Sequence, residues 1–203
     1  LADFSYKSRQ INCGGCTAKC SLTIITFSDG HRFISGNRCE KGAGITKKDT
    51  APCLYQYKYE RLLSVMKSGD PASPKATIGL PLVLNMYEQL PFWKTFFNSL
   101  GFKVIISDES TRDMYFKGQH TIPSDTVCYP AKLAHGHVVD LLEKKADIIF
   151  YPCQTYNIDE GHSDNNYNCP VVAYYPEVIA GNCPELEGTT FIYDYVGIHR
   201  PKD

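Results

Sequence analysis

The sequence lacks the features that mark membrane proteins, secreted proteins and general binders of polyanions. No apolar run approaches the about 20 residues that a membrane-spanning helix needs, and the N-terminal residues contain no signal-peptide core. The 21 basic and 22 acidic residues give a net charge of -1, which argues against broad electrostatic attraction to nucleic acid or to a lipid surface. We therefore expect neither nucleic acid nor a membrane among its partners.

Several motifs for familiar chemistry are also absent. The chain has no G-x-G-x-x-G after a predicted strand, no G-x-x-x-x-G-K-[ST] and no G-x-S-x-G. These absences argue against a dinucleotide fold of the usual kind, a P-loop and a serine-hydrolase elbow. His135 and His137 lie two residues apart in a predicted helix, so they point to different faces and do not chelate one ion together. We expect one of them to contact the sheet.

Cysteine is abundant, with nine in 203 residues. A secreted disulfide scaffold usually has an even number of cysteines in a shorter chain, together with a signal segment. The count therefore favours metal or iron–sulfur ligation in a reducing compartment. Because the chain starts at Leu1 rather than Met, we expect it to be part of a longer protein.

Four of these cysteines, near the N-terminus, have the spacing of a zinc-ribbon-like site. The pattern is Cys13-x2-Cys16-x3-Cys20, followed by Cys39. Between them, residues 22–27 and 31–34 flank an Asp-Gly turn, which predicts a β-hairpin. Four thiolates would complete a structural zinc site, although an iron–sulfur cluster uses the same ligands, and free or disulfide-bonded thiols are the alternative. We expect Cys53 to be a packing residue.

The remaining pattern predicts two domains. Residues 10–67 form the cysteine-rich metal-binding module with a short helix at 55–66, and a proline-containing loop at 68–75 marks the boundary. Residues 76–203 form the second domain, in which helices at 86–100, 108–117 and 130–145 alternate with short apolar runs. We assign strands to these runs, at 77–84, 102–107, 147–151, 171–175 and 189–196. The alternation predicts an α/β fold with a Rossmann-like, mainly parallel sheet.

Three further cysteines are expected at one edge of this sheet. Cys128 precedes a helix that has Pro130 in its first turn, and Cys153 follows a predicted strand. In a parallel sheet both positions face the carboxyl edge, where open α/β sheets bind ligands. Cys183 follows the predicted strand 171–175, so we expect it at the same edge. Cys169, beside Pro170 at the start of that strand, is expected to be a buried packing residue.

Two long segments resemble a known family. They read IGLPLVLNMYEQLPFWKTFFNSLGFKVIISDES and IPSDTVCYPAKLAHGHVVDLLEKKADIIFYPC. They are similar to the domain of unknown function found in the large activators of 2-hydroxyacyl-CoA dehydratases, the long relatives of the (R)-2-hydroxyglutaryl-CoA dehydratase activase. The resemblance covers residues 77–195, and CGGCTAKCSLTIITF and GNRCEKG also resemble the cysteine module that precedes this domain.

The resemblance implies a cytoplasmic activator, or reductase, system of anaerobic bacteria or archaea. Its partners would be an ATP-binding activase domain of the same longer protein and a dehydratase-like protein. It implies a [4Fe–4S] cluster at Cys128 and Cys153, with Cys183 as the third ligand on edge geometry, used for ATP-driven transfer of a low-potential electron. The ATPase motifs are absent from this chain, so we expect it not to be catalytic alone. The alternatives are a zinc-stapled docking module without chemistry and an acyl-CoA-binding domain.

Overall fold

The computed structural model describes residues 4–45, 52–67 and 69–199. The chain divides into two compact units, with the division between Cys53 and Leu54. The short helix at 54–64 therefore belongs to the larger, C-terminal unit, whereas the sequence pattern grouped it with the cysteine-rich module. Among the described helices, none is long and apolar enough to cross a membrane.

The N-terminal unit is a three-stranded antiparallel sheet. Its strands are β1 (Tyr6–Asn12), β2 (Ser21–Phe27) and β3 (Arg32–Ser35), in the order β1-β2-β3. The predicted hairpin is confirmed as β2 and β3, joined at the Asp-Gly turn. Strand β1 was not predicted, because its residues YKSRQIN are all exposed and show no apolar alternation. Leu22 and Ile24 are the only hydrophobic side chains among residues 4–45 that are buried.

The larger unit contains a four-stranded parallel sheet, as the alternating pattern predicted. Its strands are β4 (Thr77–Leu80), β5 (Lys103–Ile106), β6 (Ile148–Phe150) and β7 (Thr190–Ile192), in the order β5-β4-β6-β7. The register pairs Ile78 with both Val104 and Ile148. After β5 the chain crosses back over β4 to form β6, so the strand order reverses between β4 and β6.

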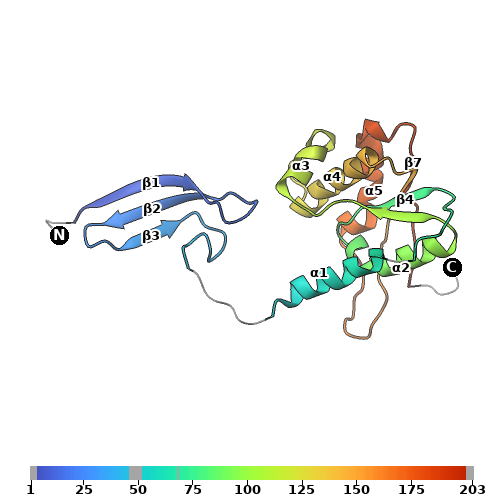
Figure 1. The fold of residues 1–203 in the computed structure, drawn as a ribbon, viewed down its shortest axis with the longest axis horizontal. Coiled ribbons are helices and arrows are strands. Elements are labelled where there is room, and N and C mark those ends of the chain that lie inside the picture. The colour runs from blue at the N-terminus through green and yellow to red at the C-terminus, as the bar shows by residue number, and fades with distance from the viewer. Residues whose placement is uncertain (1–3, 46–51, 68, 200–203) are drawn as a thin grey trace. The chain divides into compact units, whose positions relative to one another are not determined.

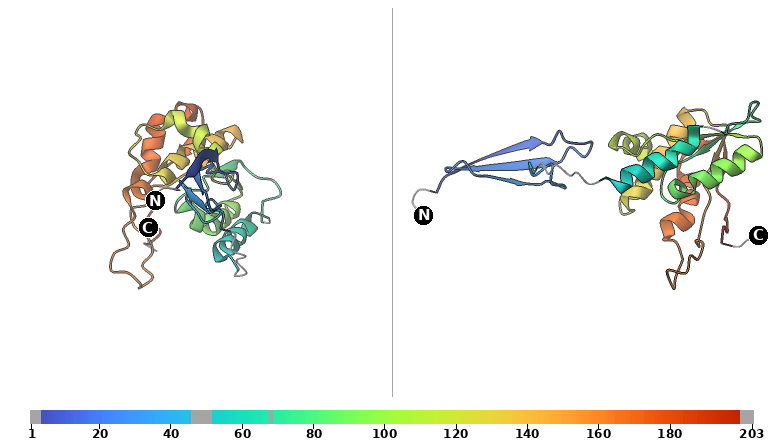
Figure 2. Two further views of the ribbon diagram at one scale, coloured as in Figure 1. Left: turned by 90° about the vertical axis from the view of Figure 1, so that its left-hand side faces the viewer. Right: turned by 60° about the horizontal axis from the view of Figure 1, so that its bottom comes forward.

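Helices cover both faces of this sheet (Figure 1). On one face lie α1 (Leu54–Ser64) and α2 (Met86–Ser99), which run side by side in Figure 2. On the other face lie α3 (Arg112–Gly118), α4 (Tyr129–Glu143) and α5 (Pro170–Asn182). Trp93 and Phe97 of α2 pack on Phe150 of β6, with ring centroids 4.6 and 5.0 Å away. Helix α2 remains a single helix, although Pro91 lies inside it.

The packing of α3 against α4 depends on two glycines. A Cβ atom added to Gly136 would lie 1.9 Å from the carbonyl oxygen of Met114, and one added to Gly118 would lie 2.2 Å from the Gly136 nitrogen. These distances are far below a van der Waals contact, so no other residue fits without moving a helix. The close approach holds α3 and the loop before it against the middle of α4.

One predicted strand is wrong. Residues 171–175, VVAYY, lie in α5, which continues to Asn182. Four of these five residues are β-branched or aromatic, which is the composition of a strand, but periodicity does not separate such a short apolar run from a buried helical segment. Pro170 in the first helical turn is the local signal for the helix that forms.

Candidate functional site

The carboxyl edge of the parallel sheet brings several polar loops and three cysteines to one side of the larger unit. Cys128 is the N-cap of α4 and Cys169 is the N-cap of α5. Their backbone angles are nearly identical, with φ -62° and ψ 155° for Cys128 and φ -63° and ψ 156° for Cys169. Both residues are exposed, and neither forms a disulfide with another described cysteine. Each therefore stands at the positive end of a helix dipole, in the same local geometry.

Cys153, the third cysteine at this edge, extends β6 beyond its last ladder pair. Its backbone N–H donates to Asp194 O at 3.1 Å, and its carbonyl accepts from Val196 N at 2.9 Å. The side chain is fully buried, and this burial raises the pKa of the thiol to about 11 despite a hydrogen bond from the Glu177 backbone. Cys153 is therefore a neutral thiol unless a cation replaces its proton.

A buried polar chain lies beneath these cysteines. His135 of α4 is completely buried; its Nδ1 bonds the Thr121 hydroxyl at 2.6 Å and its Nε2 bonds the Tyr175 hydroxyl at 3.1 Å. Burial, with a smaller effect from the charge of His120, lowers the pKa of His135 to about 4. Tyr151 is also buried, and its hydroxyl has no partner among the described residues. Cys153 and Cys169 act electrostatically on this hydroxyl, so it lies in the neighbourhood of both thiols.

His137 joins the loop after β5 to α4. Its Nδ1 bonds the Ser107 hydroxyl at 2.7 Å and its Nε2 bonds the exposed Ser110 hydroxyl at 2.9 Å. Because Ser107 Oγ already accepts from Leu82 N–H at 2.7 Å, we assign its proton to Nδ1 and the imidazole proton to Nε2. Burial lowers the pKa of His137 to about 4, so the ring is neutral near pH 7. His137 Nε2–H therefore donates to the Ser110 hydroxyl, so the ring orients Ser110 and does not act on it as a general base.

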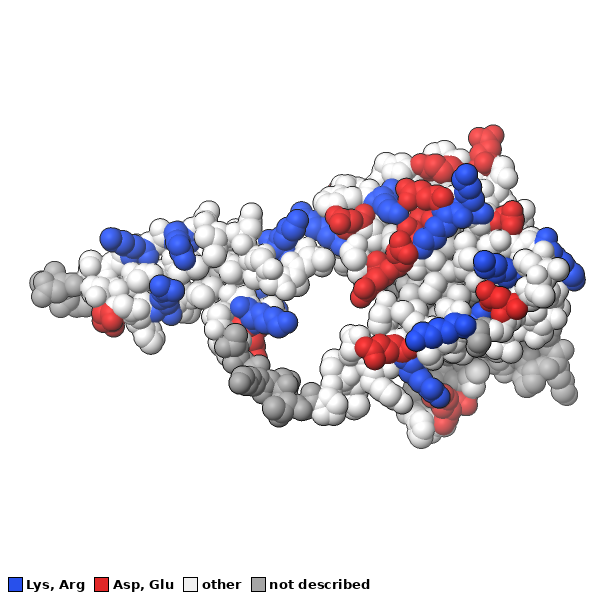
Figure 3. Space-filling model, in the orientation of Figure 1, with Lys and Arg blue, Asp and Glu red and all other residues white. Residues whose placement is uncertain are grey.

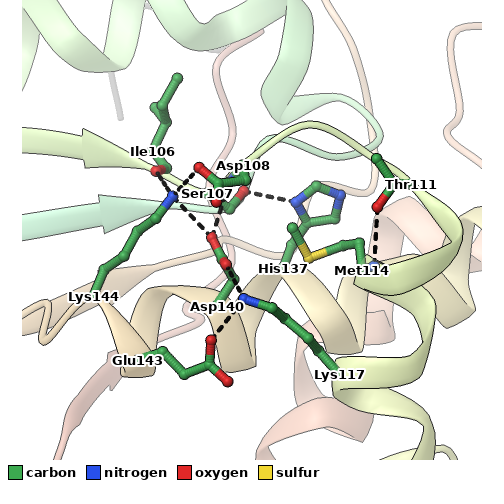
Figure 4. Close-up of polar contacts among 10 residues, drawn as sticks. All are labelled: Ile106, Ser107, Asp108, Thr111, Met114, Lys117, His137, Asp140, Glu143 and Lys144. Carbon is green, nitrogen blue, oxygen red and sulfur yellow. Dashed lines mark hydrogen bonds and ion pairs between the residues drawn. The ribbon is translucent and has the colours of Figure 1, made fainter.

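Figure 4 shows an ionic cluster directly beside His137. The Asp140 side chain is 2% exposed and accepts from Lys117 Nζ at 2.6 Å, Lys144 Nζ at 2.9 Å and the Asp108 backbone N–H at 2.9 Å. Burial alone raises the pKa of Asp140, but these three donors outweigh it and hold the pKa below its ordinary value. Lys144 also donates to Ile106 O and Asp108 Oδ1. The cluster fixes the end of β5 on α4.

The surface charge shows no strong bias. On the face shown in Figure 3, acidic and basic side chains of the larger unit are interspersed rather than separated by sign. This agrees with the net charge of -1 and gives no broad basic surface for a polyanion on that face.

A cluster of side-chain amides lies where the strand order reverses. Gln154, next to Cys153, is completely buried and exchanges hydrogen bonds with Gln89 of α2 at 2.7 and 2.9 Å. Asn85 also donates to Gln154 Oε1, and Trp93 Nε1 donates to Gln89 Oε1 at 2.9 Å. Leu84, two residues before α2, has a left-handed backbone with φ 52°, which is unfavourable for leucine and sets the direction of the turn into the helix.

All four N-terminal cysteines lie at one end of the smaller sheet. Antiparallel pairing places the end of β1, the start of β2 and the end of β3 together, and the cysteines occupy the segments 13–20 and 36–44 that leave this end. Cys13 N–H donates to Cys20 O at 2.8 Å, and Gly15 N–H approaches Cys13 Sγ at 3.4 Å. Gly36, with φ 81°, passes so close to Ser21 O that a Cβ would lie 2.3 Å away. These thiols are exposed or half-exposed.

Neither group of cysteines forms a ready-made site for a single ion. Across residues 4–45, 52–67 and 69–199, no three histidine, cysteine or acidic side chains lie close enough together to bind a metal ion. The expectation of a metal-ribbon-like module is therefore supported only for the hairpin and the placement of its thiols.

A family model described as the CoA enzyme activase uncharacterised domain matches residues 77–203. The chain belongs to this family. The resemblance to the domain of unknown function in these activators is thereby confirmed, and a role in activation is consistent with it. Neither the search of curated proteins nor that of solved structures found a match.

Within the CoA enzyme activase domain, the cysteines are arranged differently from the sequence expectation. Cys183 ends α5, whereas Cys169 begins it, so a 13-residue helix of about 20 Å separates them. Since α5 runs from the carboxyl edge at β6 towards the start of β7, Cys183 leaves that edge. It is 4% exposed and packs in the core, and burial raises the pKa of its thiol to about 11. The prediction that Cys183 lies at this edge assumed a strand at residues 171–175, but these residues are helical.

Among the cysteines at the carboxyl edge of the sheet, Cys169 is the one whose environment was predicted wrongly from the sequence. It was expected to be buried, but the structure exposes it at a helix N-terminus. The signal was present in the sequence, because Cys169-Pro170 and Cys128-Tyr129-Pro130 are the same combination of cysteine and helix-starting proline. The amides of Asn85, Gln89 and Gln154 carried no comparable signal.

Proposed function

We propose that this domain holds a [4Fe–4S] cluster through Cys128, Cys153 and Cys169, and that it takes part in ATP-driven transfer of a low-potential electron. The electron would come from an ATP-binding activase domain of the same longer protein and go to a dehydratase-like protein in the cytoplasm. The observation that carries the proposal is the matched geometry of Cys128 and Cys169 on either side of the strand end that bears Cys153. Family membership supports the activator role.

The chemistry of the residues fits this cofactor. Thiolates are the ligands that iron–sulfur clusters prefer, and helix N-termini favour the negative charge of a ligated cluster. A four-iron cluster is wider than one ion, so its ligands lie further apart than those of a mononuclear site. The buried Tyr151 hydroxyl, which has no partner within the described part of the chain, lies near Cys153 and Cys169 and would donate to a sulfur there. When bound, the cluster would supply one-electron chemistry.

The chain's own residues would tune such a centre. Cys153 is buried, so ligation requires the loss of its proton, and cluster binding at this position should release a proton. Tyr175 lies near Cys128, and the hydrogen bond to His135 holds its hydroxyl in place beneath the cysteines. Buried hydrogen bonds of this kind adjust the reduction potential of iron–sulfur clusters.

For the N-terminal unit, we propose a structural zinc ion held by Cys13, Cys16, Cys20 and Cys39. Four soft thiols gather at one end of a sheet whose described part buries only two hydrophobic side chains. A unit with so little core needs another source of stability, and a tetrahedral zinc–thiolate site is the usual one. Iron would bind the same ligands, so the two metals must be separated by measurement.

The test is metal and sulfide analysis with absorption and electron paramagnetic resonance spectra, on protein purified and reconstituted without oxygen. We expect iron and sulfide in the wild-type protein and their loss in Cys128→Ser and Cys169→Ser. Cys183→Ser is the matched control, because it changes a cysteine at the other end of the same helix and should keep the cluster. Cys13→Ser and Cys39→Ser should lose zinc and keep iron.

Two outcomes would contradict the proposal. Iron retained in Cys169→Ser but lost in Cys183→Ser would restore the ligand set expected from sequence. Zinc alone, unchanged in the Cys128 and Cys169 variants, would leave a zinc-stapled docking module without redox chemistry. Acyl-CoA binding is less well supported, because the described residues that line the pocket at this edge include no lysine or arginine to receive the CoA phosphates.

A further inference from the structure

We propose that the pocket beside the amide cluster binds an uncharged polyhydroxy compound, a sugar or polyol. This site lies at the reversal of strand order between β4 and β6, where open α/β sheets bind ligands. Its cavity of about 560 Å³ is within the size range of small-molecule sites. The N-terminal part of α2 forms one wall, and the long loop between Cys153 and Cys169, which projects from the unit in Figures 1 and 2, forms another.

The lining is unusually rich in amides. Six of the lining side chains are of this type: Asn85, Gln89, Asn157, Asn165, Asn166 and Asn168. A side-chain amide offers two donors and an accepting oxygen in one plane, which matches the paired donor and acceptor character of neighbouring hydroxyl groups. The exposed ring of Tyr167 also lines the pocket and offers a flat apolar surface to the C–H face of a sugar.

One buried acceptor in this pocket is unsatisfied. The oxygens of Gln89 and Gln154 each accept two hydrogen bonds within the amide cluster. Asn85 uses its amide nitrogen towards Gln154, and its Oδ1 is buried without a partner among the described residues. A buried acceptor of this kind costs about 1–3 kcal/mol unless a donor reaches it. A ligand hydroxyl that reached this oxygen would supply the missing donor.

The charges in the lining disfavour anions. It contains the carboxylates Glu88 and Glu160 and the exposed histidine His162, and no lysine or arginine is among its described residues. Glu88 is paired with Lys58, which lies outside the pocket, and Glu160 stands in the loop. A phosphorylated or carboxylated ligand would therefore meet two carboxylates, with no lysine or arginine among the described lining residues to offset them. This separates the proposed ligand from nucleotides and from CoA.

The test uses the whole 203-residue chain without iron and four probes: D-glucose, myo-inositol, glucosamine and glucose 6-phosphate. Binding is followed by NMR through the side-chain amide signals of Asn85 and Gln89. Fluorescence of the single tryptophan, Trp93, is a second readout because its indole N–H bonds Gln89. We expect saturable shifts with at least one uncharged probe, and binding of glucose 6-phosphate at least about tenfold weaker than that of glucose.

Variants decide whether Asn85 is the recognition group. Asn85→Ala should weaken binding about fivefold through the lost acceptor, and Asn85→Asp, which keeps an acceptor, should retain the uncharged probe. Asn98→Ala is the matched control. Asn98 lies in the helix that Asn85 precedes, its buried Oδ1 also has no partner among the described residues, and it lies outside this pocket. No binding of either uncharged probe, equal binding of the phosphate, or an unchanged affinity in Asn85→Ala would overturn the proposal. None of these results depends on a cluster at the cysteines.

Discussion

Cys128 and Cys169 have the same backbone conformation at the N-termini of two neighbouring helices, with φ and ψ values that differ by only 1°. Each is followed within two residues by a proline in the first helical turn. Proline restricts the residue directly before it, which is Cys169 at α5 but Tyr129 at α4. Cys128 has the extended backbone that an N-cap position requires, so the local chain selects both conformations without a ligand. The edge is therefore shaped by the backbone before any cofactor binds.

The two buried histidines should make the protein less stable in mild acid. Their folded pKa values of about 4 lie below the ordinary 6.5, so the unfolded chain binds more protons between these values. Stability is then full above about pH 6.5 and falls as the pH drops towards 4, by roughly 3 kcal/mol for each histidine. Urea unfolding at pH 7.5 and 4.5 measures the difference. His137→Gln should remove about half of it, whereas His162→Gln, in an exposed loop, should not change it.

Removing the charge of Asp140 should strongly destabilise the larger unit. Asp140→Asn leaves Lys117 and Lys144 without their central, nearly buried partner, and breaking such a pair costs about 3 kcal/mol. Glu143→Gln removes the other partner of Lys117, but that side chain is 56% exposed, so its loss should cost at most about 1 kcal/mol. Chemical unfolding of the two variants tests this order, and equal losses would refute the assigned role of the cluster.

Gly136→Ala should disrupt the contact between α3 and α4. The added carbon would overlap a backbone oxygen rather than a flexible side chain, so we expect a loss of about 3 kcal/mol or more. Gly181→Ala is the control, because Gly181 is also helical and has nothing within 4 Å of an added Cβ. That substitution should leave the midpoint of thermal unfolding unchanged or raise it. A similar loss in both variants would contradict the close packing.

The boundary between the two units is testable by truncation. Residues 54–203 should fold without the N-terminal unit, because the connected hydrophobic core lies between Ile78 and Leu186. A fragment that starts at residue 76 loses α1 and with it the stacking of Tyr59 on Tyr87, whose ring centroids are 5.8 Å apart. It also loses Asp70, which forms an ion pair with Lys94. Its free energy of unfolding should be lower by a few kcal/mol. Equal stability of the two fragments would place the boundary where the sequence pattern put it.

Prediction from the sequence was most reliable where the period of the apolar residues, the length of the run and the turn residues all indicated the same element. The alternation of short apolar runs and helical patterns predicted the parallel sheet, and Asp29-Gly30 predicted the hairpin. Residues 171–175 were misassigned because a five-residue apolar run has no period long enough to distinguish helix from strand. Strand β1 was missed since its conformation comes from pairing with β2 rather than from its own side chains.

Prediction of the candidate site was also limited to what local sequence signals can indicate. Cys128 and Cys153 were placed at the sheet edge from local signals, while the error in one strand moved Cys183 onto that edge and hid Cys169. The amide cluster could not be predicted, because Gln154 lies 65 residues after Gln89 and amide pairs leave no spacing rule. Such contacts arise from topology and become visible only when the chain is folded.

The long loop after β6 begins with Gln154, directly after Cys153, and ends with Asn168, directly before Cys169. The two ends of the loop are tied together, because Asn168 Nδ2 donates to the backbone oxygen of Gln154 at 2.9 Å, and Asn168 also lines the pocket. A ligand that holds this loop therefore also holds the spacing between the two thiols. Linkage is reciprocal, so whatever fixes the thiols must change the affinity for that ligand by the same factor.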